Sequence, residues 1–309
     1  LYVRLRADFK FAFKSFGILS TLCYNACMDT VRVKAYAKIN LTLSVTGVKD
    51  GYHMLDSIVT SVDLYDAVKV KKRRDGLVSV TMRGCGSENI PFGSNNAVKA
   101  AQAFIEKYST RGADITVNKN IPVGAGLGGS SADAAGVLLA LARLYDVRDT
   151  AGIKLIADRI GSDVRYMLSG GYARLFGRGN EVKPLESKLK LYFLLLVPKA
   201  RISSAECYKA FDLRAVFGGD GDGAETALEA GDKTLFSGYV SNALTTAANG
   251  LCAEVGEAIE ALKAFDPLAV NMTGSGSGVY AVFENAEFRD YAKSRYRGNA
   301  AVYALKTQL

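Results

Sequence analysis

The sequence predicts an α+β protein built from two domains. Alternating apolar and polar residues, which are typical of strands, dominate the first half of the chain, whereas helical and strand-like segments alternate in the second half. A chain of 309 residues is long enough to form two hydrophobic cores. With 49% hydrophobic and 23% charged residues, the composition is that of a globular protein. No apolar run approaches the roughly 20 residues that a membrane-spanning helix needs, so we expect no membrane association.

The net charge of +8 is compatible with nucleic acid, a membrane surface or an anionic small molecule as partner. Lysines and arginines are spread along the chain, and their one cluster, at 71–74, precedes the turn signal Asp75–Gly76. No nucleic-acid-binding motif accompanies that cluster, so no nucleic-acid partner is expected. Five cysteines without a Cys-x-x-Cys pair, beside one histidine, disfavour a zinc site. Free thiols are typical of a cytoplasmic protein.

Residues 1–27 differ from the rest and are not expected to join the fold. They show no clear periodicity and combine four basic residues with a single acid: Arg4, Arg6, Lys10, Lys14 and Asp8. A basic, acid-poor targeting leader is one interpretation. The preferred one is a translation start placed too far upstream, with Met28 as the true first residue, because a strand pattern begins just after it.

Strands come first in the chain. Alternation over 31–48 indicates a strand pair or a bent strand, with apolar side chains on one face at Ile39, Leu41, Leu43 and Val45. The alternating segment 58–70 is expected to pair with 77–82 around the turn at Asp75–Gly76.

Helices and strands alternate in the remainder. A Ser-Asn-Asn run at 94–96 predicts the start of a helix to about Tyr108, and a strand at 115–119 leads into a glycine-rich loop and a helix to about Tyr145. Further helices are expected at 150–160, near 161–164, and at 224–230, 234–247, 251–264 and 286–295, with strands at 170–176, 191–197, within 270–283 and at 301–305. We place the domain boundary at 175/176, inside an interval of 165–190 in which it must fall.

The clearest chemical signal lies within residues 119–141. Four glycines fall in six positions and are followed by two serines and an Ala/Leu run of helical character: Gly124, Gly126, Gly128, Gly129, Ser130 and Ser131. Glycines let backbone N–H groups approach a ligand, and the start of a helix carries partial positive charge. The stretch therefore favours a phosphate site. A flexible turn with a serine cap is the alternative, because the stretch lacks the Gly-Lys-Ser/Thr ending of the Walker loop.

Four further motifs accompany this loop. They are Tyr-Ala-Lys-Ile-Asn-Leu at 36–41, Asp-Gly-Tyr-His at 50–53, Gly-Ser-Asp-Val at 161–164 and Asn-Met-Thr-Gly-Ser-Gly-Ser at 271–277. Together with the loop they resemble the GHMP superfamily of small-molecule kinases, from about Met28 to the C-terminus. Ala-Lys-Ile-Asn-Leu and Gly-Tyr-His are similar to the branch that acts on 4-diphosphocytidyl-2-C-methyl-D-erythritol.

The resemblance implies a two-domain GHMP kinase fold. Its N-terminal ATP-binding domain, 28–175, is expected to hold a mixed sheet with helices, and its C-terminal domain, 176–309, to be ferredoxin-like α+β on the substrate side. The implied activity is phosphorylation of the 2-hydroxyl of the cytidine diphosphate substrate, with ATP and Mg²⁺, in non-mevalonate isoprenoid precursor synthesis, by a monomer or homodimer. Two alternatives stay open: another GHMP kinase, such as homoserine kinase, and a non-catalytic basic binding protein of the same fold.

The resemblance assigns two catalytic residues. Taken alone, Lys38 is most simply a solvated strand lysine and Asp163 a first-turn helix acid. The resemblance implies that Lys38 lies beside Asp163 and the transferred phosphate. It makes Asp163 the base that accepts the proton of the attacking hydroxyl.

The nucleotide and substrate contacts are also expectations from the resemblance. The ATP side comprises the residues Asn96, Lys119, Pro122, Gly124, Gly126, Leu127, Gly128, Gly129, Ser130 and Ser131, with Ser131 also expected near Mg²⁺. On the substrate side, Tyr52 is expected to stack on cytosine, His53 to bond the base edge and Tyr208 to close the sandwich, although an ordinary core aromatic fits Tyr208 nearly as well. Asn40 is expected near the substrate hydroxyls, and the loop with Thr273, Gly274 and Ser275 behind the diphosphate.

The chain departs from the family pattern at two places. Ser130 stands where the family usually has glycine, so its hydroxymethyl group either crowds a phosphate or donates to it. Arg165–Tyr166 follow Asp-Val where proline is common. An arginine two residues from Asp163 either strengthens anion binding or disturbs the base.

Overall fold

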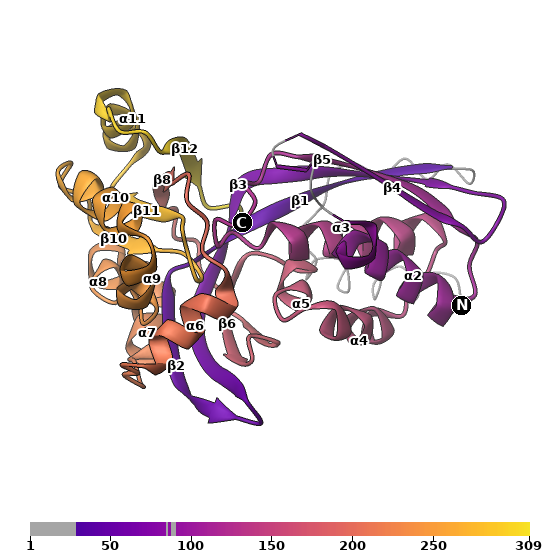
Figure 1. Cartoon of the computed structure of the whole chain (residues 1–309), viewed down its shortest axis with the longest axis horizontal. Helices are drawn as coiled ribbons and strands as arrows, with labels where there is room; N and C mark the ends of the chain where they lie inside the picture. Colours follow the sequence, from indigo (N-terminus) through magenta and orange to yellow (C-terminus); the bar gives the residue numbers. More distant parts are fainter. Residues whose placement is uncertain (1–28, 85, 88–90) are drawn as a thin grey trace.

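The computed structural model describes residues 29–84, 86–87 and 91–309. The expected leader, 1–27, lies outside the described residues, as do Met28 and Cys85. Figure 1 shows an elongated molecule in which the long strands β1 (Thr30–Asn40) and β3 (Tyr52–Lys72) connect an N-terminal half to a C-terminal half. No helix in the described part of the chain is long and apolar enough to cross a bilayer.

The first sheet is organised around β3, which is 21 residues long. Its first part pairs with β2 (Thr42–Lys49) and β6 (Tyr172–Gly177), and its last part with β5 (Ala113–Lys119). Strand β1 pairs with it antiparallel over most of their shared length, and β7 (Glu181–Pro184) extends the sheet from β6. The segment 58–62 is fully buried because both faces of the sheet are covered there.

The hairpin expected between 58–70 and 77–82 is wrong. Strand β4 (Val78–Gly84) pairs parallel with β5, so β5 separates it from β3. The connection around Asp75 is therefore a wide turn, and the backbone N–H of Gly112 at the start of β5 donates to Asp75 O at 2.6 Å. Arg73 also bonds both Asp75 and Asp114, which holds β5 between the two strands. Local alternation predicted the strands but not the strand inserted between them.

The N-terminal helices lie together on one face of this sheet (Figure 1). They are α2 (Asn96–Tyr108), α3 (Gly129–Leu144), α4 (Thr150–Ile160) and α5 (Val164–Met167), preceded by the short η1 (Phe92–Ser94). Helix α3 is buried along most of its length. A Cβ at Gly136 would lie 2.9 Å from Val68 and 3.2 Å from Ala35, so glycine lets the helix approach the sheet closely.

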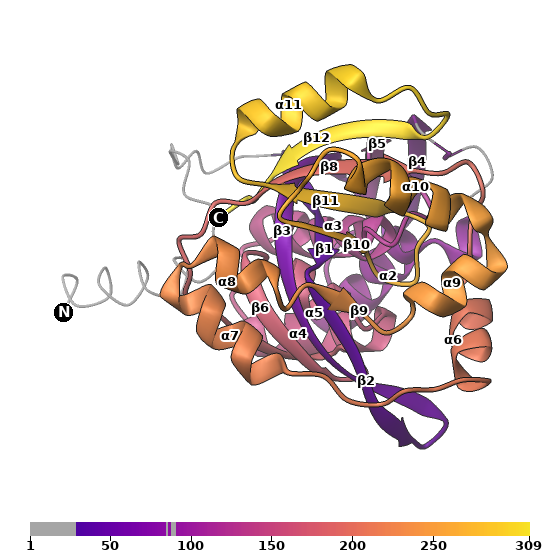
Figure 2. The ribbon, with the colours of Figure 1, turned by 90° about the vertical axis from the view of Figure 1, so that its left-hand side faces the viewer.

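The second sheet confirms the ferredoxin-like prediction. Its order is β10 (Ala269–Met272), β11 (Val279–Phe283), β8 (Tyr192–Val197), β12 (Ala301–Lys306), with all neighbours antiparallel. Figure 2 shows this sheet in front of the N-terminal half. The helices of this half are α6 (Ser204–Asp212), α7 (Gly221–Ala230), α8 (Lys233–Ser237), α9 (Thr245–Leu251), α10 (Ala253–Lys263) and α11 (Ala286–Arg295). The single helix expected over 234–247 is wrong, because strand β9 (Ser241–Asn242) separates α8 from α9.

Strand pairing joins the two halves in addition to the continuous polypeptide chain. Strand β9 pairs parallel with β2 of the first sheet, and Thr307, just after β12, forms a bridge with Val62 of β3. The expected boundary at 175/176 falls inside β6, whereas the chain changes sheet between β7 and β8. Residues 185–191 therefore connect the two sheets.

Candidate active site

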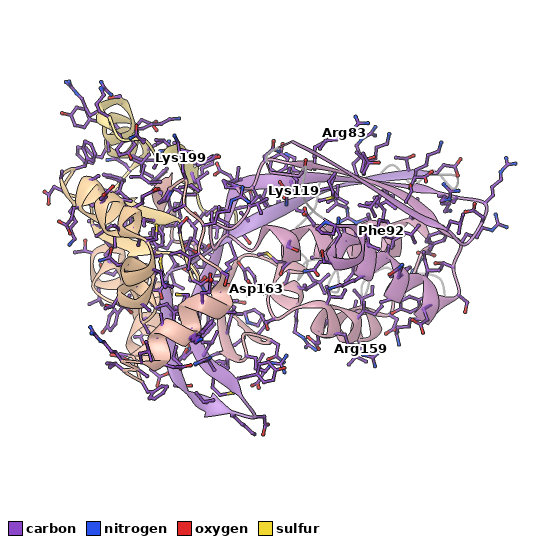
Figure 3. The ribbon with its side chains drawn as sticks, viewed as in Figure 1. Arg83, Phe92, Lys119, Arg159, Asp163 and Lys199 are labelled. Carbon is purple, nitrogen blue, oxygen red and sulfur yellow. The ribbon has the colours of Figure 1, made fainter. Side chains whose placement is uncertain are left out.

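A cavity of about 610 Å³ lies where the two halves meet. Its wall is formed by the glycine loop, the ends of β1 and β3, the turn before α5, and residues of α6 and the loop between β10 and β11. The site residues expected from the sequence that line it are Lys38, Asn40, Tyr52, His53, Lys119, Pro122, Gly124, Gly126, Leu127, Gly128, Gly129, Ser130, Ser131, Asp163, Tyr208, Gly274 and Ser275. Figure 3 shows Asp163 between the two halves.

The glycine loop needs glycine for two reasons. Gly124, Gly126 and Gly128 have φ of +76°, +73° and +70°, a region that L side chains rarely adopt. A Cβ at Gly126 would lie 2.0 Å from the carbonyl oxygen of Thr273, and one at Gly128 would lie 2.4 Å from Met167 Cε. The loop is thus pressed against the C-terminal half on one side and α5 on the other.

Helix α3 begins at this loop, and the backbone N–H groups of its first turn are available to a ligand. Its N-cap is Gly128, which provides no side-chain cap hydrogen bond, and the cavity reaches Ser130 and Ser131 in the first turn. The first N–H groups of a helix have no partner within the helix, and the helix dipole makes this end positive. The arrangement fits a phosphate group.

Lys38 and Asp163 meet in the cavity. Strand β1 has a register shift between Tyr36 and Lys38, and Lys38 N donates to Leu127 O at 3.0 Å, which joins the strand to the glycine loop. The Lys38 Nζ lies 3.6 Å from Asp163 Oδ2. The lysine side chain is 6% exposed and that of Asp163 is 31% exposed. Asp163 occupies the N-cap position of α5. Its side chain makes no hydrogen bond to the helix, so the carboxylate stays available to a ligand.

Asn40 orients the lysine. Lys38 Nζ donates to Asn40 Oδ1, and Asn40 Nδ2 donates to Ser57 Oγ at 2.9 Å, so the amide is held at both ends. Thr273 lies behind Asn40, where its Oγ1 accepts from Asn40 N at 3.1 Å and donates to Gly126 O at 3.2 Å. Thr273 is fully buried and does not line the cavity, so it would act on the substrate diphosphate only through the loop that it supports. It joins the glycine loop to β1.

Lys119 belongs to a buried cluster of charges. Its ammonium bonds Asp66 and, at 2.7 Å, Asp133 Oδ2. Asp66 also accepts from Ile121 N at 2.8 Å, which holds the start of the glycine loop. Burial raises the pKa of Asp133 to about 8, against the opposing charge of Lys119. The amine of Lys119 is thus committed to carboxylates, which favours support of the loop over contact with adenine.

Asn95, and not Asn96, faces the cavity. Asn95 has extended backbone, is the N-cap of α2, and accepts from Ala97 N at 2.9 Å. Asn96 is the first helical residue and is absent from the cavity wall. The sequence could not separate the two, because adjacent asparagines both suit a helix start.

Two of the rings expected at the cytosine are in contact with each other. Tyr208 stacks on His53, with ring centroids 4.5 Å apart and planes 24° apart. Burial raises the pKa of Tyr208, and the charge of nearby Asp163 raises it further. His53 Nε2 lies 2.7 Å from Asp212 Oδ1. Tyr52 is half exposed, and the guanidinium of Arg178 lies over its ring.

The two departures from the family pattern leave the site intact. Ser130 is exposed at the cavity, so its hydroxymethyl group has room. Arg165 is engaged by Asp158, with Nε donating to Oδ1 at 2.6 Å. Its guanidinium is therefore held on α4 and does not line the cavity.

Arg178, Ser204 and Asp212 are three of the polar residues at the site that sequence reasoning missed. Arg178 and Ser204 line the cavity, and Asp212 bonds His53 from behind. Ser204 Oγ lies 2.8 Å from Ser275 Oγ, which links α6 to the loop between β10 and β11. None of the three falls in a recognisable motif, and an isolated arginine or aspartate on a turn or helix end is common at a protein surface.

Comparison with known proteins defines the class. Models of the GHMP kinase N-terminal and C-terminal domains match residues 95–173 and 224–302. A homoserine kinase from Cytophaga hutchinsonii shares the fold, with a TM-score of 0.70 and 17% identity over 92% of this chain and 96% of that chain. Fold and domain models thus define a GHMP kinase, which confirms the predicted fold class.

Closer matches define the family within that class. A solved 4-(cytidine 5'-diphospho)-2C-methyl-D-erythritol kinase superposes with a TM-score of 0.74 and 29% identity, covering 89% of this chain and 98% of that one. The kinases of the same name from Clostridium beijerinckii and Desulfitobacterium hafniense are 35% and 37% identical, over 82% and 84% of this chain and 91% and 89% of theirs. The chain belongs to the 4-diphosphocytidyl-2-C-methyl-D-erythritol kinase family, as its motifs predicted.

Proposed function

We propose that this protein transfers the γ-phosphoryl group of ATP to the 2-hydroxyl of 4-diphosphocytidyl-2-C-methyl-D-erythritol, in non-mevalonate isoprenoid precursor synthesis. The observation that carries the proposal is the meeting of Lys38, Asp163 and the glycine loop in one cavity. Relatives with this name cover most of the chain. The likeness to homoserine kinase, at 17% identity, supports the fold alone.

ATP would bind with its phosphates on the loop from Gly126 to Ser131. Close approach of the phosphates is supported by the absence of a Cβ atom at Gly126, Gly128 and Gly129 and by the uncapped start of α3. Pro122, Leu127 and Asn95 line the same cavity and would enclose the rest of the nucleotide. Lys119 would act indirectly, by holding the loop through Asp66. The glycine loop of the N-terminal half would thus hold the phosphates of ATP, and residues of both halves would enclose the substrate.

Asp163 would take the proton of the attacking hydroxyl. A positioned general base contributes about 10²–10⁴-fold to a rate. The neighbouring ammonium of Lys38, 3.6 Å away, would stabilise negative charge on the transferred group. Asn40 keeps that ammonium in place. The carboxylate accepts and the ammonium neutralises, so neither residue can replace the other.

Mg²⁺ would be held mainly by the phosphates and water. The described residues contain no group of three or more His, Cys, Asp and Glu side chains that could hold an ion. Mg²⁺ commonly keeps several waters and takes one or two protein ligands, which fits the Ser131 hydroxyl, because Ser131 lines the same cavity as Asp163. When bound, the ion neutralises charge on the β- and γ-phosphates.

The cytosine would stack on Tyr52 and bond His53. Tyr208 would support His53 from behind, because the two rings are already stacked. Gly274 and Ser275 would line the diphosphate path. We infer a cytoplasmic enzyme, either a monomer or a homodimer, and sedimentation velocity distinguishes these two states.

A coupled assay tests the function. Purified protein, ATP, Mg²⁺ and 4-diphosphocytidyl-2-C-methyl-D-erythritol should yield ADP and a monophosphorylated product. Homoserine in place of that substrate should yield no ADP above background. Turnover of homoserine without turnover of the cytidyl substrate would reject the proposal.

A further inference from the structure

Three positively charged side chains line the cavity among the described residues: Lys38, Lys119 and Arg178. Two of them are paired with carboxylates. Lys38 faces Asp163, and Lys119 bonds both Asp66 and Asp133. Within the described part of the chain, no carboxylate lies within ion-pair distance of Arg178. Arg178 is therefore the cavity cation whose charge stays available to a ligand.

Arg178 sits on a turn with defined geometry. It follows β6, between Gly177 and Gly179, whose φ values are +61° and +89°. Gly179 N donates to Phe176 O at 3.0 Å, and Arg178 N donates to Asn180 Oδ1 at 3.2 Å, so the backbone is held. The side chain is exposed. Because the backbone of Arg178 is held and its side chain is exposed, the guanidinium is presented to the cavity.

The guanidinium is oriented by Tyr52. Its central carbon lies 4.0 Å from the centre of that ring, which is a close cation–π contact. Stacking occupies one face of the group and leaves the N–H donors, which lie in its plane, pointing away from the ring. A planar fork of donors matches two oxygens of a phosphate.

We propose that Arg178 binds the diphosphate of the cytidyl substrate while its stacking on Tyr52 orients the ring for the base. The inference rests on the proposed function, whose substrate carries two adjacent phosphates between base and sugar alcohol. The phosphates then lie next to the aromatic contact at Tyr52. Lys38 remains with the transferred phosphoryl group. The transferred group and the substrate diphosphate therefore each contact a different cation, Lys38 and Arg178.

The test is binding of cytidine, CMP and CDP, measured by calorimetry on the wild-type protein and three variants. Arg178→Met removes the charge and the donors, and Arg178→Lys keeps a charge without the planar fork. Arg159→Met is the matched control, because Arg159 lies exposed on α4 away from the site (Figure 3). In Arg178→Met we expect CDP to bind about tenfold or more weakly and cytidine to change less than about twofold. Arg178→Lys should recover part of the loss, and Arg159→Met should match wild type.

The assay kinetics supply a second measurement. Arg178→Met should raise KM for the cytidyl substrate about tenfold and leave KM for ATP unchanged. Equal weakening of cytidine and CDP would overturn the diphosphate contact, because it would mean that Arg178 acts through the base. Unchanged CDP affinity in Arg178→Met would also overturn it. Failure of the proposed function looks different, since wild type itself would then neither bind CDP nor turn over the substrate.

Discussion

At the scale of single residues, Lys38 is held by more than its contact with Asp163. A 3.6 Å contact between a buried ammonium and a partly exposed carboxylate leaves the acid able to reach a substrate. Asn40 and Ser57 hold the lysine from the other side, so its position does not require Asp163. The lysine thus has a partner that fixes its position, and the carboxylate of Asp163 has a face that remains open.

Asp163→Asn tests the base. The substitution keeps the shape and removes the proton acceptor, so we expect kcat to fall about 10²–10⁴-fold with an unchanged thermal midpoint. The coupled assay and differential scanning calorimetry measure the two quantities. Near-normal turnover in this variant would show that Asp163 is not the base.

Asp212→Ala tests the support of His53. A carboxylate only accepts, so Nε2 of His53 donates to Asp212, and this contact holds the imidazole ring in place. Loss of Asp212 should raise KM for the cytidyl substrate about tenfold, with kcat and KM for ATP nearly unchanged. Asp212→Asn, which retains an accepting oxygen, should recover part of the loss. A uniform fall in kcat would instead indicate a general structural effect.

At the scale of elements, the site lies where segments end. The glycine loop joins β5 to α3, and Asp163 stands at the start of α5. Strand ends and helix starts leave backbone groups unpaired, which makes them suitable for binding anions. Gly126 shows how tightly these ends are pressed together, because its neighbour across the cavity wall is a backbone carbonyl of the loop before β11.

Gly126→Ala tests this contact. The new Cβ would lie 2.0 Å from Thr273 O at a φ of +73°, so the loop must move. We expect a loss of about 1–3 kcal/mol in unfolding free energy and a marked rise in KM for ATP. Gly250→Ala in α9 is the control, because no atom lies within 4 Å of its added Cβ, and it should be neutral or slightly stabilising. Chemical denaturation that finds the two variants equal would contradict the packing argument.

At the scale of the whole molecule, the cavity exists only because the two sheets are joined. Tyr280 OH of β11 donates to Asn40 O at 2.9 Å, and Arg174 of β6 bonds residues of α7. The guanidinium of Arg174 also donates two hydrogen bonds to the carboxylate of Asp56. The Arg174 side chain is 9% exposed. Hydrogen bonding to Lys183, and to a smaller extent to Arg174, lowers the pKa of Glu225.

Arg174→Met tests this connection. Removing one member of a largely buried charge cluster leaves Asp56 and Glu225 without it, so we expect a loss of about 3 kcal/mol measured by urea unfolding. The lowered pKa of Glu225 means that its stabilising effect is present above its ordinary value of 4.5 and is lost as pH falls below it. Wild type should therefore lose more stability than Arg174→Met between neutral and acid pH. An equal loss in both would mean that the cluster does not stabilise the fold.

Local patterns in the sequence determined the class, the family and most helices and strands. The glycine loop, Ala-Lys-Ile-Asn-Leu and Gly-Ser-Asp-Val each act within a few residues, so the sequence displays them directly. Helix α2, with its asparagine cap, and the alternating strand β3 are local in the same sense.

Only the tertiary structure decided what depends on contacts between distant segments. It inserted β5 between β3 and β4, turned Asn95 instead of Asn96 to the cavity, stacked Tyr208 on His53, and buried Thr273 behind Asn40. It also brought Arg178 to Tyr52. The physical reason is that strand order and side-chain pairing follow from burial and hydrogen bonding across the whole fold, and these leave no periodic or spaced pattern along the chain.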